Sequence, residues 1–295
     1  MTNKRSALAG LFFLTCTLAL TAAAQAETIA SPVVFAAHRA IYELSIDSST
    51  PGSGVAAVTG RIVYELSGSA CEGYTQNMRF VTVTSNSEGS GQTTDLRTSS
   101  WEQVPAQKLR FSSSTYSNDQ LAEQARGTAQ RPSLQDAPEV DLAKPEKKLF
   151  NIGSTVYFPM QHSAALIQAA RTGQKQFTAD LYDGSESGSK VYMTSALIGN
   201  KLEPGKGAVT ALAGQKAEMA LGAVASWPVS ISYFAKTGDA PVKHKDELPL
   251  YEMSYRFHEN GVTSNLRLDY GEYAMRGELK ELTFLEPSSC PAGTP

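Results

Sequence analysis

Apolar and polar residues alternate along most of this chain, and that alternation restricts its fold more than any other feature. Side chains that recur at every second position belong to strands buried on one face. About a dozen such strands, with no alternation of strands and helices, predict an all-β fold. The clearest runs are Tyr42, Leu44 and Ile46; Ile62, Tyr64 and Leu66; Tyr74, Met78 and Phe80; and Tyr251, Met253, Tyr255 and Phe257.

A sheet of so many strands has to curl, because exposed edges invite association and long open sheets bend or split. Asn260 and Gly261 follow the last of these runs and predict a tight hairpin. One helix is predicted over residues 162–171, where Ala165, Leu166 and Ala169 recur at helical spacing. We therefore expect a long antiparallel sheet that curls into a spiral or open barrel around one α-helix.

Two segments lack the alternation of large apolar residues. Residues 117–148 are rich in Gln, Ala, Glu, Pro and Lys, which predicts an excursion over the surface or a short helical insertion at residues 119–126. Residues 200–221 are rich in Gly, Ala and Lys, which predicts an irregular, exposed connection.

The N-terminus has the pattern of a secretory signal. Lys4 and Arg5 precede an apolar run over residues 7–24, and Ala24 and Ala26 form a small-x-small cleavage site. We expect residues 1–26 to be removed, which leaves residues 27–295 as a single domain in the exported protein. An uncleaved anchor helix and lipid attachment at Cys16 are the alternatives.

Only Cys71 and Cys290 remain after such a cleavage. A lone pair of cysteines in an exported chain predicts a disulfide, because an oxidising compartment favours it. The bond would fasten the early part of the fold to its last residues and contribute about 5 kcal/mol by restricting the unfolded chain. Two free buried thiols are the alternative.

Sequence motifs for catalysis, metals or cofactors are not found, so we predict no catalytic residue, no metal ligand and no cofactor. The four histidines, His38, His162, His244 and His258, have no metal-binding spacing. A formal net charge of −3 with no basic patch excludes nucleic acid as an expected partner, and no further stretch after the signal is apolar enough to span a membrane.

Two further groups of residues could still carry a function. Carboxylates at Asp180 with Asp183, and at Asp269 with Glu272, leave open a secreted hydrolase that acts on envelope polysaccharide. Aromatic residues on strand faces could instead line a concave apolar surface for a lipid or acyl chain, or they could fill the core. The candidates for lining such a surface are Tyr42, Tyr64, Tyr251, Met253 and Tyr255.

Several short motifs are spread along the chain: A-H-R-A-x-Y-x-L at residues 37–44, G-R-I-V-Y at 60–64, S-A-C-E-G-Y at 69–74, F-P-x-x-H at 158–162, L-Y-D-G at 181–184 and I-G at 198–199. Together they resemble the motifs of one family, the EipB family of periplasmic cell-envelope integrity proteins.

The resemblance implies a periplasmic β-spiral clipped by a disulfide between Cys71 and Cys290. It also implies a role in envelope integrity without established enzymatic activity, and a fold similar to periplasmic lipoprotein carriers. We therefore expect a non-enzymatic protein that binds a periplasmic partner protein or a hydrophobic envelope component, such as a lipid or lipoprotein.

Overall fold

The computed structural model describes residues 32–206, 215–236, 248–286 and 288. The chain divides into two units, residues 1–31 and 32–295, and every described residue lies in the second. The expected signal at residues 1–26 and Cys290 both fall outside the described residues, so cleavage and the disulfide stay predictions.

Among the described residues of this second unit, fifteen strands form one hydrogen-bonded sheet. The first eight are β1 (His38–Ser49), β2 (Ala57–Ser69), β3 (Gly73–Ser85), β4 (Gly91–Glu102), β5 (Lys108–Ser117), β6 (Gln120–Gln130), β7 (Glu139–Lys144) and β8 (Lys148–Asn151). The other seven are β9 (Val156–Tyr157), β10 (Gln176–Leu181), β11 (Tyr192–Ile198), β12 (Ser226–Ala235), β13 (Tyr251–His258), β14 (Thr263–Asp269) and β15 (Tyr273–Phe284).

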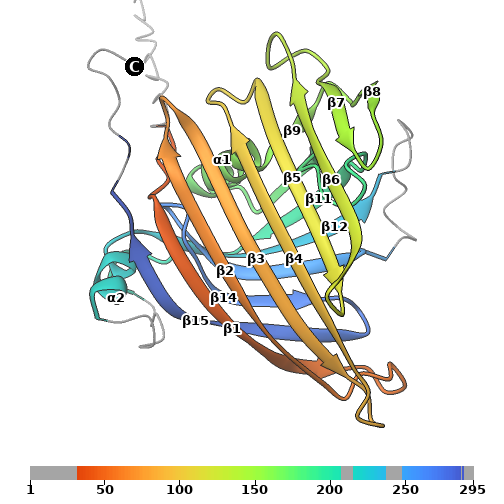
Figure 1. The fold of residues 1–295 in the computed structure, drawn as a ribbon. Helices are drawn as coiled ribbons and strands as arrows, with labels where there is room; N and C mark the ends of the chain where they lie inside the picture. The colour runs from red at the N-terminus through yellow and green to blue at the C-terminus, as the bar shows by residue number, and fades with distance from the viewer. Residues whose placement is uncertain (1–31, 207–214, 237–247, 287, 289–295) are drawn as a thin grey trace, which may run out of the picture. The chain divides into compact units, whose positions relative to one another are not determined.

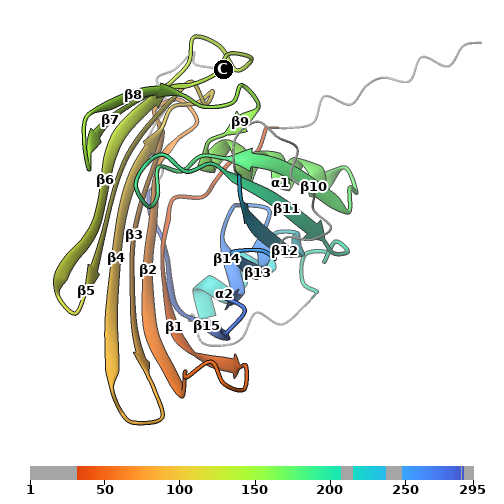
Figure 2. The same cartoon turned by 90° about the vertical axis from the view of Figure 1, so that its right-hand side faces the viewer.

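The pairing of the first strand with the last explains how the sheet curls. β1 lies between β2 and β15, with His38 opposite Leu66 on one side and Phe284 on the other. The edge strands are β8 and β9, and residues 152–155 alone separate them in the chain. The two edges are therefore one short loop apart, and the two halves of the sheet face each other (Figures 1 and 2). The predicted curled all-β sheet is confirmed.

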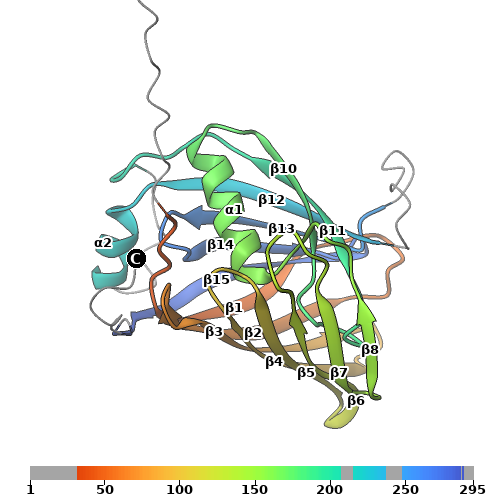
Figure 3. The ribbon, with the colours of Figure 1, turned by 90° about the horizontal axis from the view of Figure 1, so that it is seen from above.

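The helix α1 (Pro159–Arg171) lies inside the curve of the sheet, as Figure 3 shows from above. It connects β9 to β10, which form a parallel pair. Met160, Leu166 and Ile167 are buried against the inner faces of strands from both halves of the sheet. The predicted helix is thus confirmed, and its apolar face fills one end of the curl.

The helix begins three residues before its predicted start at His162. The carboxylate of Glu102, at the end of β4, accepts hydrogen bonds from the backbone N–H groups of Met160 at 2.7 Å and Gln161 at 2.8 Å. These two N–H groups would otherwise lack a partner in the first turn. Pro159 has no N–H to satisfy, which suits the first position of a helix.

The surface excursion or helical insertion predicted for residues 117–148 is wrong, because most of this segment forms β6 and β7. The fully buried residues of β6 are small, namely Ala125 and Ala129. The loop after β10 packs on them so closely that a Cβ on Gly188 would come 3.2 Å from the Ala125 methyl. Small inner residues therefore mark close packing here, although in the sequence they look like a polar, exposed segment.

The irregular connection predicted for residues 200–221 is wrong at its end, where the helix α2 (Gln215–Gly222) forms. Leu221 is 1% exposed and packs in a core cluster with Val262 and Leu266. A helix of eight residues is too short to be stable by propensity alone, so it depends on this packing.

Candidate ligand-binding cavity

A cavity of about 570 Å³ lies inside the curl, between the inner faces of β1–β6 and those of β10–β14. Its volume falls within the range of small-molecule sites, roughly 300–1,000 Å³. Aromatic and aliphatic residues make up just over half of its lining, and serine, threonine and other polar residues make up most of the rest. Such a lining is typical of sites that hold a largely apolar ligand.

The structure brings the five residues that the sequence suggested as ligand-lining onto the wall of this one cavity. They come from its two sides: Tyr42 and Tyr64 from β1 and β2, and Tyr251, Met253 and Tyr255 from β13. They also contact the core clusters around them. These residues therefore both pack against the core and line the cavity.

Two of these phenols have fixed orientations. The hydroxyl of Tyr42 donates to the backbone oxygen of Thr263 at 2.7 Å, which ties β1 to the start of β14. Burial raises the pKa of Tyr42 to about 12. The hydroxyl of Tyr64 donates to Oε1 of Gln76 at 3.2 Å, and burial raises its pKa as well. Both phenols therefore stay neutral at physiological pH.

A row of tyrosines, which the sequence reasoning mostly missed, extends this wall across successive strands. The ring centroids are 6.2 Å apart for Tyr192 and Tyr233, 4.4 Å for Tyr233 and Tyr251, and 6.1 Å for Tyr251 and Tyr270. All four line the cavity. The sequence shows that these tyrosines lie near the ends of predicted strands. It does not show how the strands pair, and the alignment of the rings depends on that pairing.

Polar groups line several parts of the cavity wall, including hydroxyl side chains of β4 and β5, and the loop between β10 and β11 supplies two carboxylates. Glu186 accepts a hydrogen bond from the Tyr192 hydroxyl at 2.6 Å and forms an ion pair with Lys190 at 2.6 Å. Asp183 accepts the backbone N–H of Ser185 at 2.9 Å, and burial raises the pKa of this carboxyl. The cavity therefore has a polar patch beside a long apolar wall.

The charged groups on the wall have one sign. None of the described residues that line the cavity is a lysine or an arginine, whereas Glu123, Asp183 and Glu186 are acidic. Lys190, beside this patch, is already paired with Glu186, and burying an anionic head group next to the carboxylates would cost free energy. The geometry favours a ligand whose polar end is neutral or donates hydrogen bonds.

The carboxylate pairs considered for a hydrolase lie in different settings. Asp183 lines the cavity, but Asp180, Asp269 and Glu272 are not among the lining residues. Asp180 forms an ion pair with Lys236 at 2.6 Å, and Asp269 forms one with Arg267 at 2.8 Å. Neither pair therefore places two carboxylates together on the cavity wall.

The three described histidines have structural hydrogen bonds. His38 contacts the backbone oxygen of Ala36 at 2.7 Å, and His162 contacts the Thr194 hydroxyl at 3.0 Å. His258 contacts the Ser264 hydroxyl at 2.9 Å. Within the described ranges, no group of three potential ligands is arranged to hold a metal ion, and no helix is long and apolar enough to cross a bilayer. His244 lies outside these ranges.

The fold and the cavity together define an all-β protein in which one curled sheet, plugged by a helix, encloses a mainly apolar pocket. Sequence comparison gives the particular family. The chain belongs to the EipB-like family, whose sequence model matches residues 29–286. The resemblance found in the short motifs is thereby confirmed.

Two matches from Brucella abortus show how far the similarity extends. The cell envelope integrity protein EipB of strain 2308 is 35% identical over 260 residues, which cover 88% of each chain. A crystal structure described as a beta-barrel-like protein of domain of unknown function DUF1849 matches with a TM-score of 0.74 and 32% identity. That match covers 86% of this chain and 100% of the other.

Proposed function

We propose that this chain is exported to the periplasm and supports the integrity of the cell envelope by holding an acyl-chain component of the envelope in its cavity. The cavity inside the curl, about 570 Å³ in volume and mainly aromatic and aliphatic in lining, is the observation that carries this proposal. The relative named as a cell envelope integrity protein supports the envelope role. The signal pattern of residues 1–26 supports export.

The chemistry of the cavity wall restricts which kinds of ligand can bind. An acyl chain would lie along the apolar side, where Tyr64, Met253 and Tyr255 are only partly buried. A neutral head group with hydroxyls would meet the acidic patch around Asp183 and Glu186, to which it can donate hydrogen bonds. A free fatty acid would place its carboxylate against these side chains. We therefore expect neutral acyl lipids to bind and fatty acids to bind weakly.

Displacement of the fluorescent apolar probe N-phenyl-1-naphthylamine from the purified protein tests this function. Mono-oleoylglycerol and oleate have the same chain and differ in the head group, so they form a matched pair of competitors. We expect mono-oleoylglycerol to displace the probe at concentrations at least tenfold lower than oleate does. A protein that binds neither the probe nor the lipid would contradict the proposal and favour a protein partner instead.

A pair of tryptophan variants shows whether the cavity is the site. Thr98 lines the cavity from β4. Thr98→Trp therefore fills space that the acyl chain of the ligand would occupy. Val83 on β3 is 45% exposed and is not a lining residue, so Val83→Trp adds the same side chain outside. We expect Thr98→Trp to abolish probe binding and Val83→Trp to retain it, with both variants folded by circular dichroism. Equal binding by the two variants would place the ligand elsewhere.

A further inference from the structure

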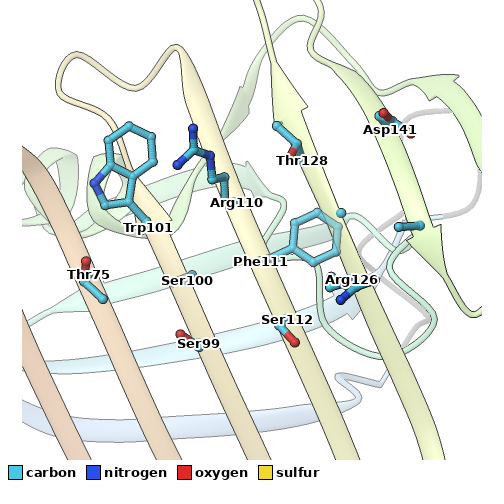
Figure 4. Close-up of a pocket in the computed structure, with 12 residues that line it drawn as sticks. Thr75, Ser99, Ser100, Trp101, Arg110, Phe111, Ser112, Arg126, Thr128 and Asp141 are labelled. Atoms are coloured by element: carbon cyan, nitrogen blue, oxygen red, sulfur yellow. The ribbon is translucent and has the colours of Figure 1, made fainter.

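A second hollow of about 460 Å³ lies on β3–β7, and it shares Ser99, Ser100, Phe111 and Ser112 with the lining of the cavity. Side chains alternate between the two faces of a strand, and on β5 Ser113 and Thr115 line the cavity while Arg110 belongs to this outer groove. Figure 4 shows Trp101, Arg110 and Thr128 next to one another on three strands. The residues of the groove on which the following argument rests, Trp101, Arg110, Arg126, Thr128 and Asp141, do not line the cavity.

The indole of Trp101 is held in place on this outer face. Its Nε1 donates to the backbone oxygen of Glu72 at 3.2 Å. Gly73 makes room for it, because a Cβ there would come 3.0 Å from Nε1. The guanidinium of Arg110 lies 5.0 Å from the ring centroid, within the range of a cation–π contact. The aromatic ring and the guanidinium thus form one ordered platform.

The arginines of the groove differ from their neighbours on the same face. Arg79 and Arg97 share the carboxylate of Asp95, at 2.8 Å and 2.7 Å. Arg110 and Arg126, both exposed, form no ion pair with any described residue. The adjacent strands β5 and β6 thus each present one arginine that is not engaged in an ion pair. A guanidinium can donate two parallel N–H hydrogen bonds to one carboxylate.

Hydroxyl groups surround these arginines, and they make the groove suited to a sugar. Thr75, Ser99, Ser112 and Thr128 line it together with the one carboxylate of Asp141. Hydroxyls and carboxylates exchange hydrogen bonds with sugar hydroxyls, an indole packs against the apolar face of a pyranose ring, and arginine binds an acidic substituent. We propose that this outer groove binds a carboxylate-bearing glycan, namely the muramic-acid-containing strand of peptidoglycan.

Two disaccharides that differ in the carboxylate test this inference by NMR titration of the purified protein. The probe is the N-acetylglucosamine–N-acetylmuramic acid disaccharide, and chitobiose, which lacks the lactyl carboxylate, is the control. We expect the muramyl disaccharide to shift amide signals of β4–β6 and to bind at least tenfold more tightly than chitobiose. Equal affinities, or no binding of either sugar, would overturn the inference.

Variants locate the site and separate it from the cavity. We expect Arg110→Gln and Arg126→Gln each to weaken binding of the muramyl disaccharide at least fivefold. Arg39→Gln, an exposed arginine on β1 outside the groove, should leave it unchanged. Wild-type affinity in both groove variants would refute the assignment. Thr98→Trp should retain sugar binding, so a failure of the cavity proposal and a failure of this one give different results.

Discussion

Tyr233 and Tyr251 face each other on the neighbouring strands β12 and β13, and their rings stack with centroids 4.4 Å apart at an interplanar angle of 15°. Both rings line the cavity. An aromatic pair contributes about 1 kcal/mol beyond the area that it buries. The same contact therefore stabilises the sheet and shapes the wall of the proposed binding site.

Removing one ring of this stack should lower the stability of the fold. We expect Tyr251→Ala to reduce the free energy of unfolding by about 3–4 kcal/mol, because a large aromatic side chain is lost from a packed wall. Tyr251→Phe keeps the ring and should change stability by less than about 1 kcal/mol. Urea denaturation measures both values, and equal losses in the two variants would show that the hydroxyl, not the stack, matters.

Glu102 should make stability depend on pH, because its carboxyl is 2% exposed. Burial raises its pKa to about 7, although the N–H groups of Met160 and Gln161 and the charge of Arg131 act in the opposite direction. A raised pKa means that the folded state binds the proton more tightly than the unfolded state. The stabilisation is therefore present below about pH 4.5 and is lost as the pH rises to about 7.

The variant Glu102→Gln has no proton to lose, so it isolates this effect. Between pH 4.5 and 7 the unfolding free energy of the wild type should fall relative to that of the variant, by about 3 kcal/mol at most. Chemical denaturation at several pH values measures the difference. If the wild type gains stability over the variant as the pH rises, the helix N-terminus and Arg131 outweigh burial, and the predicted direction is wrong.

Cys71 and Cys290 should form one disulfide bond. β15 ends at Phe284, which pairs with His38 on β1. On its other side, His38 pairs with Leu66 of β2. β2 ends three residues later at Ser69, and the turn that contains Cys71 follows. The end of the sheet that leads to the C-terminal residues is thus also the end that carries Cys71. Register therefore supports the proposed disulfide.

Serine variants test that proposal. Cys71→Ser, Cys290→Ser and the double variant should each lose the same stability, at most about 5 kcal/mol, because any of them removes the whole cross-link. Thermal unfolding under non-reducing conditions measures the losses. Losses that add up in the double variant would show two independent thiols rather than a disulfide.

A glycine contact helps to hold the two halves of the sheet together. Gly184, in the loop after β10, has φ +71°, and a Cβ there would overlap the ring of Phe111 on β5. We expect Gly184→Ala to cost about 2–4 kcal/mol, from backbone strain and overpacking together. Gly173→Ala is the matched control, since its φ is +80° and nothing lies within 4 Å of its Cβ position. Similar losses in the two variants would mean that the contact with Phe111 contributes little.

The sequence predicted the strands whose inner faces carry large side chains. β13 (Tyr251–His258) covers the predicted run from Tyr251 to Phe257, and the hairpin of β13 and β14 turns at Gly261, where φ is +86°. Alternate residues of these strands pack in or against the core clusters, and this is why apolar residues recur at every second position in their sequence. The fold class follows from such segments alone.

What could not be predicted depends on contacts between distant segments. The loop that contains Gly188 packs against Ala125 on the inner side of β6, which leaves room only for a small side chain there. No pattern in the local sequence reveals this contact. The strand faces suggested Tyr42 and Tyr255 as cavity residues, but the alignment of Tyr192, Tyr233 and Tyr270 depends on register. Local periodicity thus identifies candidate walls, whereas the cavity itself follows from how the sheet curls.

Native mass spectrometry of the protein released gently from its own envelope tests the proposed cavity function most directly. We predict that the wild type retains a species with the mass of a neutral acyl lipid, that Val83→Trp retains it too, and that Thr98→Trp does not. A wild-type protein that carries only its polypeptide mass, or a Thr98→Trp protein with the same bound species, would contradict the account.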